Sequence, residues 1–216
     1  MAPTQGVEQT GNMLIMELAH ARISGNGKLL SQYYKTSKQW ADYLVNNALQ
    51  SRNQTNFDGG SASSENIALK GIIGVRAMAE IARAIGQDTD AVQYGNQASS
   101  LLNSWLSQAT SSDGSHLLGT SGDQKSWSLM YNLFADKMLG LGFVPPSVID
   151  MHTRFLSNQV AANSSSAWGL PVDSTTRQDA NAAWSLFASA FVSDATVRDN
   201  IIKGVYNHAN SNQSVG

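Results

Sequence analysis

The fold of this chain is decided by one stretch, ALKGIIGVRAMAEIA at residues 68–82. Its apolar residues recur at intervals of three and four, so that Ala68, Ile72, Val75 and Ala79 share one face of an α-helix. Stripes of the same kind occur at 30–44, 94–105, 130–141 and 183–191. The sequence therefore predicts an all-α protein.

Short polar or glycine-containing links separate most of these stripes. We expect eight helices, at 9–23, 28–50, 64–85, 88–109, 126–141, 146–161, 177–192 and 194–209. Longer links fall at 51–63, 110–125 and 162–176, and the pattern leaves room for one short strand, at 115–120. Amphipathic helices joined by short links pack as antiparallel neighbours. Such hairpins build a bundle, a solenoid or an arc of an α/α toroid, and the periodicity alone does not separate these three.

Length and composition limit the domain organisation and the possible partners. With 216 residues, 42% of them hydrophobic, we expect a single folded domain over 1–216. The net charge of −2 provides no positive field for nucleic acid or for an anionic membrane surface. The longest apolar runs are too short for a transmembrane helix. Cysteine is absent, which excludes disulfides and thiolate chemistry.

Several common kinds of catalytic or cofactor site have no counterpart in the sequence. A phosphate-binding glycine loop, a Gly-x-Ser-x-Gly turn and a His-Glu-x-x-His pair are all missing. The four histidines are far apart and lack the spacing of metal ligands. Ser-x-x-Lys, a known nucleophile motif of serine amidases, is also absent. We expect no metal and no cofactor.

Four segments carry a resemblance to the secreted fungal glutaminase family, and they follow the family's order and spacing. They are VEQTGNMLIM at 7–16, NIALKGIIG at 66–74, WSLMYNLFADKMLG at 127–140, and GLPVD at 169–173 followed by WSLFA at 184–188. The chain resembles the C-terminal, α-helical part of the glutaminase A type. That resemblance implies a partial or complete α/α toroid like that of six-hairpin glycosidases. It also implies hydrolysis of L-glutamine to L-glutamate and ammonia.

The resemblance also suggests which residues line the cavity of such a toroid. Glu8 and Asp58 are the candidates for catalytic acid or base, because amide hydrolysis needs proton transfer to and from the reacting groups. The candidates for substrate binding are Asn12, Asn66, Lys70, Trp127, Tyr131 and Asp173. Each also has a structural interpretation, since acids and amides favour helix starts and large rings favour cores.

The chain departs from the family pattern in two places where the family has acids. Residues 55–60 read TNFDGG where relatives have a pair of adjacent aspartates, and 181–184 read NAAW where relatives have one aspartate. The alternative to a hydrolase is therefore a non-catalytic domain of the same ancestry that binds a glycan or a protein. Its aromatic residues would be Trp127, Tyr131, Trp168 and Trp184. An incomplete toroid would expose apolar helix faces, which suggests a homo-oligomer.

Secretion is expected from the family resemblance and from three Asn-x-Ser/Thr acceptors, which begin at Asn53, Asn163 and Asn212. The first residues, 1–6, lack the basic and apolar leader of a signal peptide. We therefore expect a secreted protein to be represented here by a processed piece or by a part expressed on its own.

Overall fold

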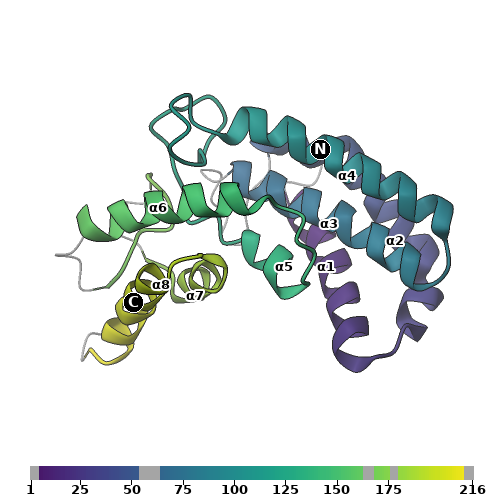
Figure 1. Ribbon diagram of the computed structural model, residues 1–216. Helices are drawn as coiled ribbons and strands as arrows, with labels where there is room; N and C mark the ends of the chain where they lie inside the picture. The colour runs from purple at the N-terminus through teal and green to yellow at the C-terminus, as the bar shows by residue number, and fades with distance from the viewer. Residues whose placement is uncertain (1–4, 54–63, 163–167, 176–179, 212–216) are drawn as a thin grey trace.

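A computed structural model describes residues 5–53, 64–162, 168–175 and 180–211 (Figure 1). Within these ranges the regular structure is helical, and β-pairing is limited to two isolated bridges. The all-α prediction is confirmed. The helices are α1 Gly6–Ser24, α2 Lys28–Asn47, the 3-10 helix η1 Ala48–Asn53, α3 Ser64–Ala84, α4 Asp88–Ala109, α5 Leu133–Met138, α6 Pro146–Ala162, α7 Ala182–Phe191 and α8 Ala195–Ala209.

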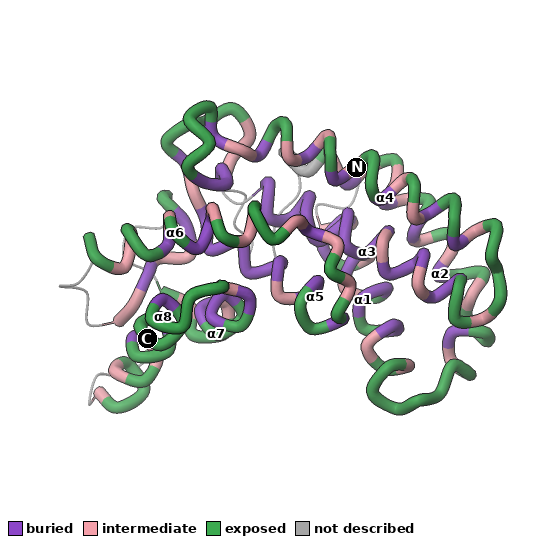
Figure 2. Tube along the Cα trace, in the orientation of Figure 1, coloured by how far each residue is buried: buried purple, intermediate pink, exposed green. Residues whose placement is uncertain are grey.

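Helix α3 forms the centre of the larger half of the molecule. Helices α1, α2, α4 and α5 all contact it (Figure 1). Seventeen of its residues are buried (Figure 2), and its less buried residues, Arg76, Glu80, Arg83 and Ala84, lie in its C-terminal half. A helix that is buried over most of its surface belongs in a core. The stretch at 68–82 therefore forms the core of the protein as well as one of its helices.

Three of the four predicted hairpins are present, and the helices α5 and α6 do not form an extensively packed fourth pair. Helices α1 and α2 are joined at Gly25, and α3 and α4 at Gly86, where the backbone φ is 66° and 76°. These left-handed conformations end a helix readily only at glycine, because a side chain would be strained there. Helices α7 and α8 form a third pair through a short link at 192–194.

The predicted helix at 126–141 is wrong over its first half. Residues 126–132 form an irregular buried segment, and only Leu133–Met138 are α-helical. Met130 has a positive φ of 49°. The backbone here bonds to a distant segment instead of to itself: Leu129 N donates to Val172 O at 2.8 Å, and Ser174 N donates to Trp127 O at 3.0 Å. Tertiary hydrogen bonds thus override a helical periodicity in the sequence.

Other boundaries differ less from the prediction. Helix α2 ends at Asn47 and continues as η1, and α7 begins only at Ala182, where the prediction began at 177. Asn181 caps α7, because its side chain accepts a hydrogen bond from Trp184 N at 3.1 Å. The strand considered at 115–120 reduces to a single bridge between Thr110 and Leu117.

Stacked aromatic rings connect the C-terminal hairpin to the centre. The rings of Tyr131 and Trp184 stack with centroids 4.2 Å apart, and those of Phe134 and Phe187 stack at 4.6 Å. Each pair joins the segment around α5 to α7. In the parts of the chain that the structure describes, no helix combines the length and the hydrophobicity that a membrane crossing needs.

Candidate functional site

The candidate residues on α1 and α3 meet in a buried ion pair. Glu8 lies in the first turn of α1, and Lys70 lies in the second turn of α3. Lys70 Nζ donates to Glu8 Oε1 at 2.6 Å, and both residues are buried. A carboxylate and an ammonium group lose hydration on burial, and this cost is offset only while the two charges stay paired. Removing one partner therefore leaves the other as an unpaired buried charge. The pair connects two of the four segments that carry the family resemblance.

Glycines allow α1 and α3 to come close enough for this contact. A Cβ placed on Gly74 would lie 3.1 Å from the Cα of Gly11, and a Cβ on Gly11 would lie 3.1 Å from the carbonyl oxygen of Lys70. A Cβ on Gly71 would lie 2.8 Å from Val7 Cγ1. Larger residues would separate the helix axes and draw Glu8 away from Lys70. The glycines in both segments therefore help to position the ion pair.

Asn66 lies one helical turn before Lys70 on α3 and is fully buried. Its Oδ1 accepts from the backbone N–H of Asn132 at 3.1 Å, and its backbone carbonyl accepts from Asn132 Nδ2 at 2.8 Å. These two bonds attach the irregular segment at 126–132 to the N-terminal end of α3. They also fix the orientation of the Asn66 amide, since only its oxygen can accept from a backbone N–H.

Two polar atoms of this cluster have no hydrogen-bond partner within the described residues. They are Oε2 of Glu8 and Nδ2 of Asn66. An unsatisfied polar atom that is buried costs on the order of 1–3 kcal/mol, and more when it carries charge. Most buried polar groups in proteins are satisfied, so a buried acceptor and a buried donor left over in one cluster call for an explanation.

Among the aromatic candidates, Tyr131 adjoins this cluster as the neighbour of Asn132 in the chain. Tyr131 precedes Asn132 and is fully buried against the ring of Trp184. Trp127 is half-buried, and its ring meets that of Phe155 edge-on at 5.9 Å. Trp168 contacts His208 in the same way at 5.6 Å. Each of these rings therefore packs against another ring of the chain.

Asp173 and Asn12 make none of the contacts described above between Glu8, Lys70, Asn66 and Asn132. Asp173 is buried and pairs by a β-bridge with Ser128, while its Oδ1 accepts from the N–H and the hydroxyl of Thr175 at 2.8 and 2.7 Å. That arrangement is an Asx turn, which supports the structural interpretation of Asp173. Asn12 lies one turn after Glu8 on α1 and is half-buried. Asp58 lies outside the described residues.

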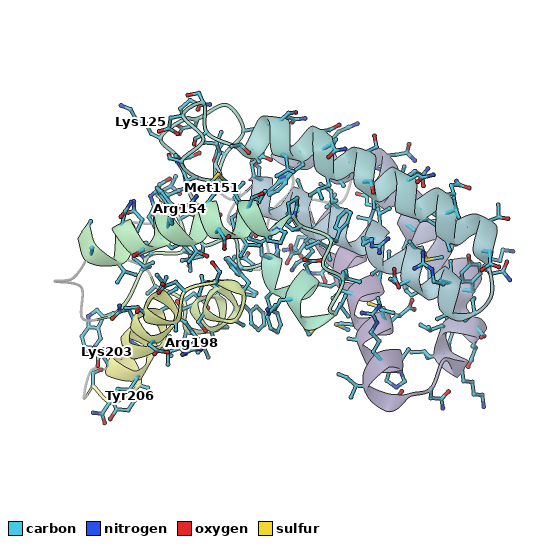
Figure 3. All side chains as sticks on the ribbon, in the orientation of Figure 1. Lys125, Met151, Arg154, Arg198, Lys203 and Tyr206 are labelled. Atoms are coloured by element: carbon cyan, nitrogen blue, oxygen red, sulfur yellow. The ribbon has the colours of Figure 1, made fainter. Side chains whose placement is uncertain are left out.

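Two grooves are formed by described residues that do not include the candidates. One of about 420 Å³ runs beside α6 and includes Met151 and Arg154, which Figure 3 labels near Lys125. One of about 260 Å³ lies between α5, α6 and the end of α7 and includes Asp136. The carboxylate of Asp136 accepts from the N–H groups of Phe143 and Val144, and burial raises its pKa. That residue stabilises the turn after α5.

His152 has a structural role in α6. His152 is fully buried, its Nδ1 accepts from Leu117 N at 3.4 Å, and its Nε2 then donates to Ser128 O at 3.1 Å. Burial lowers the pKa of His152 to about 3, so the ring is neutral. Among the described residues, no group of three or more His, Asp or Glu side chains could hold a metal ion.

Two buried polar residues in or next to the cluster are absent from the predicted set. Asn132 makes both contacts to Asn66, and Glu65, which precedes Asn66, is a buried acid at the start of α3 whose backbone N–H donates to Gly119 O at 3.2 Å. Both lie inside or beside segments that carry the family resemblance. The feature of the sequence that could have identified them is that they are polar residues within otherwise apolar stretches.

A family model and two related proteins that match this chain indicate the same family. The family model described as the glutaminase A six helical-hairpin domain matches residues 2–215. Glutaminase A of Aspergillus oryzae is 36% identical, over 89% of this chain and 28% of that protein. A probable glutaminase of Arthroderma benhamiae is 29% identical, over 82% of this chain and 23% of that protein. No solved structure gives a significant match.

The chain thus spans about a quarter of the length of these two relatives. Its match to the family model, in contrast, covers nearly every residue, including all of the segments that form the buried cluster. The chain belongs to the glutaminase A six helical-hairpin family.

Proposed function

We propose that this chain is the part of a glutaminase that supplies Glu8 as the acid–base group for hydrolysis of the glutamine side-chain amide. The observation that carries the proposal is the buried Glu8–Lys70 pair, in which Oε2 of Glu8 has no partner among the described residues. Since leaving a buried carboxylate oxygen unsatisfied is unfavourable, a role in binding or proton transfer explains why it is there.

The chemistry follows from the atoms of the cluster. Oε2 of Glu8 takes a proton from water as the water oxygen forms a bond to the amide carbon. The proton then passes to the amide nitrogen as the carbon–nitrogen bond breaks, and ammonia leaves. Nδ2 of Asn66 donates to the carbonyl oxygen, where negative charge develops in the tetrahedral intermediate. Lys70 holds the other oxygen of Glu8 and so fixes the carboxylate.

The test is ammonia release from L-glutamine by the purified chain. We expect Glu8→Gln to lose at least about a hundredfold of the rate, the lower end of what general acid–base catalysis contributes. Glu17→Gln is the matched control, because Glu17 is another buried acid of α1 but bonds to Ser37 at 2.7 Å on α2. That variant should keep the wild-type rate. Wild-type activity at background, or full activity of Glu8→Gln, would contradict the proposal.

A glycan- or protein-binding role remains a second prediction from the aromatic residues. The ring contacts of Tyr131, Trp184, Trp127 and Trp168 within the chain count against stacking of these rings on a sugar. A glycan array probed with the purified chain tests the binding role. Self-association also remains a prediction, for which light scattering after gel filtration is the measurement.

Secretion is likewise a proposal. It rests on the Asn-x-Ser/Thr acceptors, of which Asn53 is the last residue of η1, while Asn163 and Asn212 lie outside the described residues. An electrophoretic shift of the secreted protein after endoglycosidase treatment would support it, and no shift would count against use of these acceptors.

A further inference from the structure

We infer that Ser115 and His116 form a second catalytic site, in which Ser115 is the nucleophile and His116 the general base for hydrolysis of small carboxylic esters with an apolar acyl group. The two residues lie in the loop between α4 and α5, and Ser115 lines the groove of about 420 Å³ beside α6. The site shares no residue with the cluster around Glu8, so this inference does not rest on the proposed function.

The hydroxyl of Ser115 lies within hydrogen-bond distance of a histidine nitrogen. Ser115 Oγ is 2.9 Å from Nδ1 of His116, and Nε2 of the same ring is 3.2 Å from the backbone carbonyl oxygen of Ser126. A carbonyl oxygen only accepts, so Nε2 carries the hydrogen of the neutral ring and Nδ1 is an acceptor. Nδ1 is therefore the atom that can take the proton of the Ser115 hydroxyl.

The neighbouring Ser111 leaves this proton to the histidine. The hydroxyl of Ser111 donates to Asp113 Oδ1 at 2.6 Å, and its oxygen accepts from the backbone N–H groups of Ser115 and His116 at 3.0 and 3.1 Å. Those two bonds use both lone pairs of the Ser111 oxygen. This oxygen is also farther from Ser115 Oγ, at 3.4 Å, than Nδ1 of His116 is. The Ser115 hydroxyl therefore donates to His116.

The histidine ring is held in place from two sides. His116 is buried and stacks on the ring of Phe155 with centroids 4.5 Å apart, while the Ser126 carbonyl fixes its tautomer. A nucleophile bonded to a base that a third group orients is the recurring arrangement of covalent hydrolysis. Hydrogen bonds from Ser111 and Ser115 lower the pKa of Asp113 to about 2, so its carboxylate is ionised and its charge favours the imidazolium that forms.

The groove suits an ester with an apolar acyl group. Ser115 is exposed, and Met151 and Phe155 of α6 supply apolar side chains to the same groove. Figure 3 shows Met151 and Arg154 on the side of α6 that is turned towards the loop, and Arg154 is the charged residue among the described residues that line the groove. The backbone N–H groups of Ser115 and His116 are already bonded, so the guanidinium of Arg154 is the group that meets negative charge on the ester carbonyl oxygen.

The reaction has two steps. The oxygen of Ser115 bonds to the acyl carbon as its proton passes to Nδ1 of His116, and that proton then passes to the alcohol oxygen as the carbon–oxygen bond of the ester breaks. Water attacks the acyl group on Ser115 and gives a proton to Nδ1. This proton returns to the Ser115 oxygen as the carboxylic acid leaves. An ester is favoured over an amide, because an alcohol leaves more readily than an amine.

The first test is labelling of the purified chain with a fluorophosphonate, which bonds through phosphorus to an activated serine oxygen and releases fluoride. We expect one added group per chain, located on Ser115 by mass spectrometry of proteolytic peptides. Ser115→Ala should stay unlabelled. Ser112→Ala is the matched control, because Ser112 is exposed in the same loop and contacts Gln124 through its backbone N–H, so it should be labelled like the wild type.

The second test is hydrolysis of p-nitrophenyl butyrate, followed by release of p-nitrophenolate. We expect Ser115→Ala to lower the rate to background, His116→Gln to lower it at least about a hundredfold, and Arg154→Gln about tenfold or more. His20→Gln is the matched control for the histidine, because His20 is exposed on α1, and it should keep the wild-type rate. Circular dichroism establishes that the variants are folded, and mapping of the label on the wild type requires no variant.

The outcomes are distinct. An unlabelled wild type, a label on another serine, or equal hydrolysis by the wild type and Ser115→Ala would overturn the inference. A bond between Ser115 and His116 that only stabilises the loop would lower the Tm of Ser115→Ala and leave the wild type unlabelled. Labelling of a folded His116→Gln at the wild-type rate would refute the role of the base. Ester hydrolysis by a chain that releases no ammonia from L-glutamine would contradict the proposed function alone.

Discussion

The close crossing of α1 and α3 makes a direct prediction about Gly71. A Cβ at this position would lie 2.8 Å from Val7 Cγ1 and 2.9 Å from Ala48 Cβ. Both neighbours are buried, and the alanine has no rotamer by which it could move away. Since ordinary contacts begin at 3.4 Å, the helices would have to separate by about 0.5 Å.

The expected size of the effect is the balance of two terms. Replacing glycine by alanine within a helix stabilises it by about 1 kcal/mol. Overpacking a well-filled core costs about 1–3 kcal/mol. Gly71→Ala should therefore lower the free energy of unfolding by up to about 2 kcal/mol. For a chain of this size, that corresponds to a fall in Tm of several degrees.

Gly95→Ala is the matched control. Gly95 lies within α4, and a Cβ there would meet only Arg76 Nη1, at 3.7 Å. This variant gains the same helix propensity without the overpacking, so it should be slightly more stable than the wild type. The difference between the two variants isolates the overpacking cost of about 1–3 kcal/mol.

Urea unfolding followed by circular dichroism gives both values from the transition midpoints, provided that the slope m is unchanged. Equal stability of Gly71→Ala and Gly95→Ala would refute the argument that this crossing is sterically saturated. In that case the glycines would not be what positions Glu8 against Lys70.

Two further predictions concern the second half of the chain. Burial lowers the pKa of His152 to about 3, whereas an unfolded histidine titrates near 6.5, so the unfolded state binds the proton first as the pH falls. The free energy of unfolding should therefore decrease below about pH 6.5 by up to about 1.4 kcal/mol per pH unit. In chemical denaturation, the wild type should lose about 2 kcal/mol more than His152→Gln between pH 7 and pH 5. Parallel pH profiles of the two proteins would show that another group is responsible. Asn181→Ala removes the cap of α7 and should cost about 1 kcal/mol in thermal unfolding, while Asn181→Asp should retain the stability, and equal losses in both would contradict the capping role.

Much of the fold could be predicted from periodicity, because the apolar stripes at 30–44, 68–82, 94–105 and 183–191 fall within α2, α3, α4 and α7. The failure at 126–132 has a physical cause. That segment has the same apolar spacing as a helix, but its backbone bonds to residues 172–174, far along the chain. A local pattern contains no information on such a partner. The positive φ of Met130 was equally invisible, because nothing about a methionine favours it.

The site was predictable as a set of residues but not as an arrangement. Glu8, Asn66 and Lys70 were identified through the family resemblance, yet the contact between Glu8 and Lys70 joins residues that are 62 positions apart. Asn132 was missed, because it was expected within a continuous helix, where an asparagine has no special role. Its importance depends on the irregular backbone, which turns its N–H towards α3. The site depends on the same tertiary contacts that made the fold of this segment unpredictable.

The extensive burial of α3 also determines how the protein opens. Amide hydrogens exchange slowly where a helix is released only by unfolding of the whole domain, and quickly where one neighbour can be lost alone. Helix α3 contacts α1, α2, α4 and α5, whereas α8 packs mainly against α7 and α6. Asn66 and Lys70 therefore lie on the element with the highest expected protection, and Glu8 on a helix held directly against it. Their side chains are organised by the most slowly exchanging part of the protein, and local fluctuations of the C-terminal hairpin leave them in place.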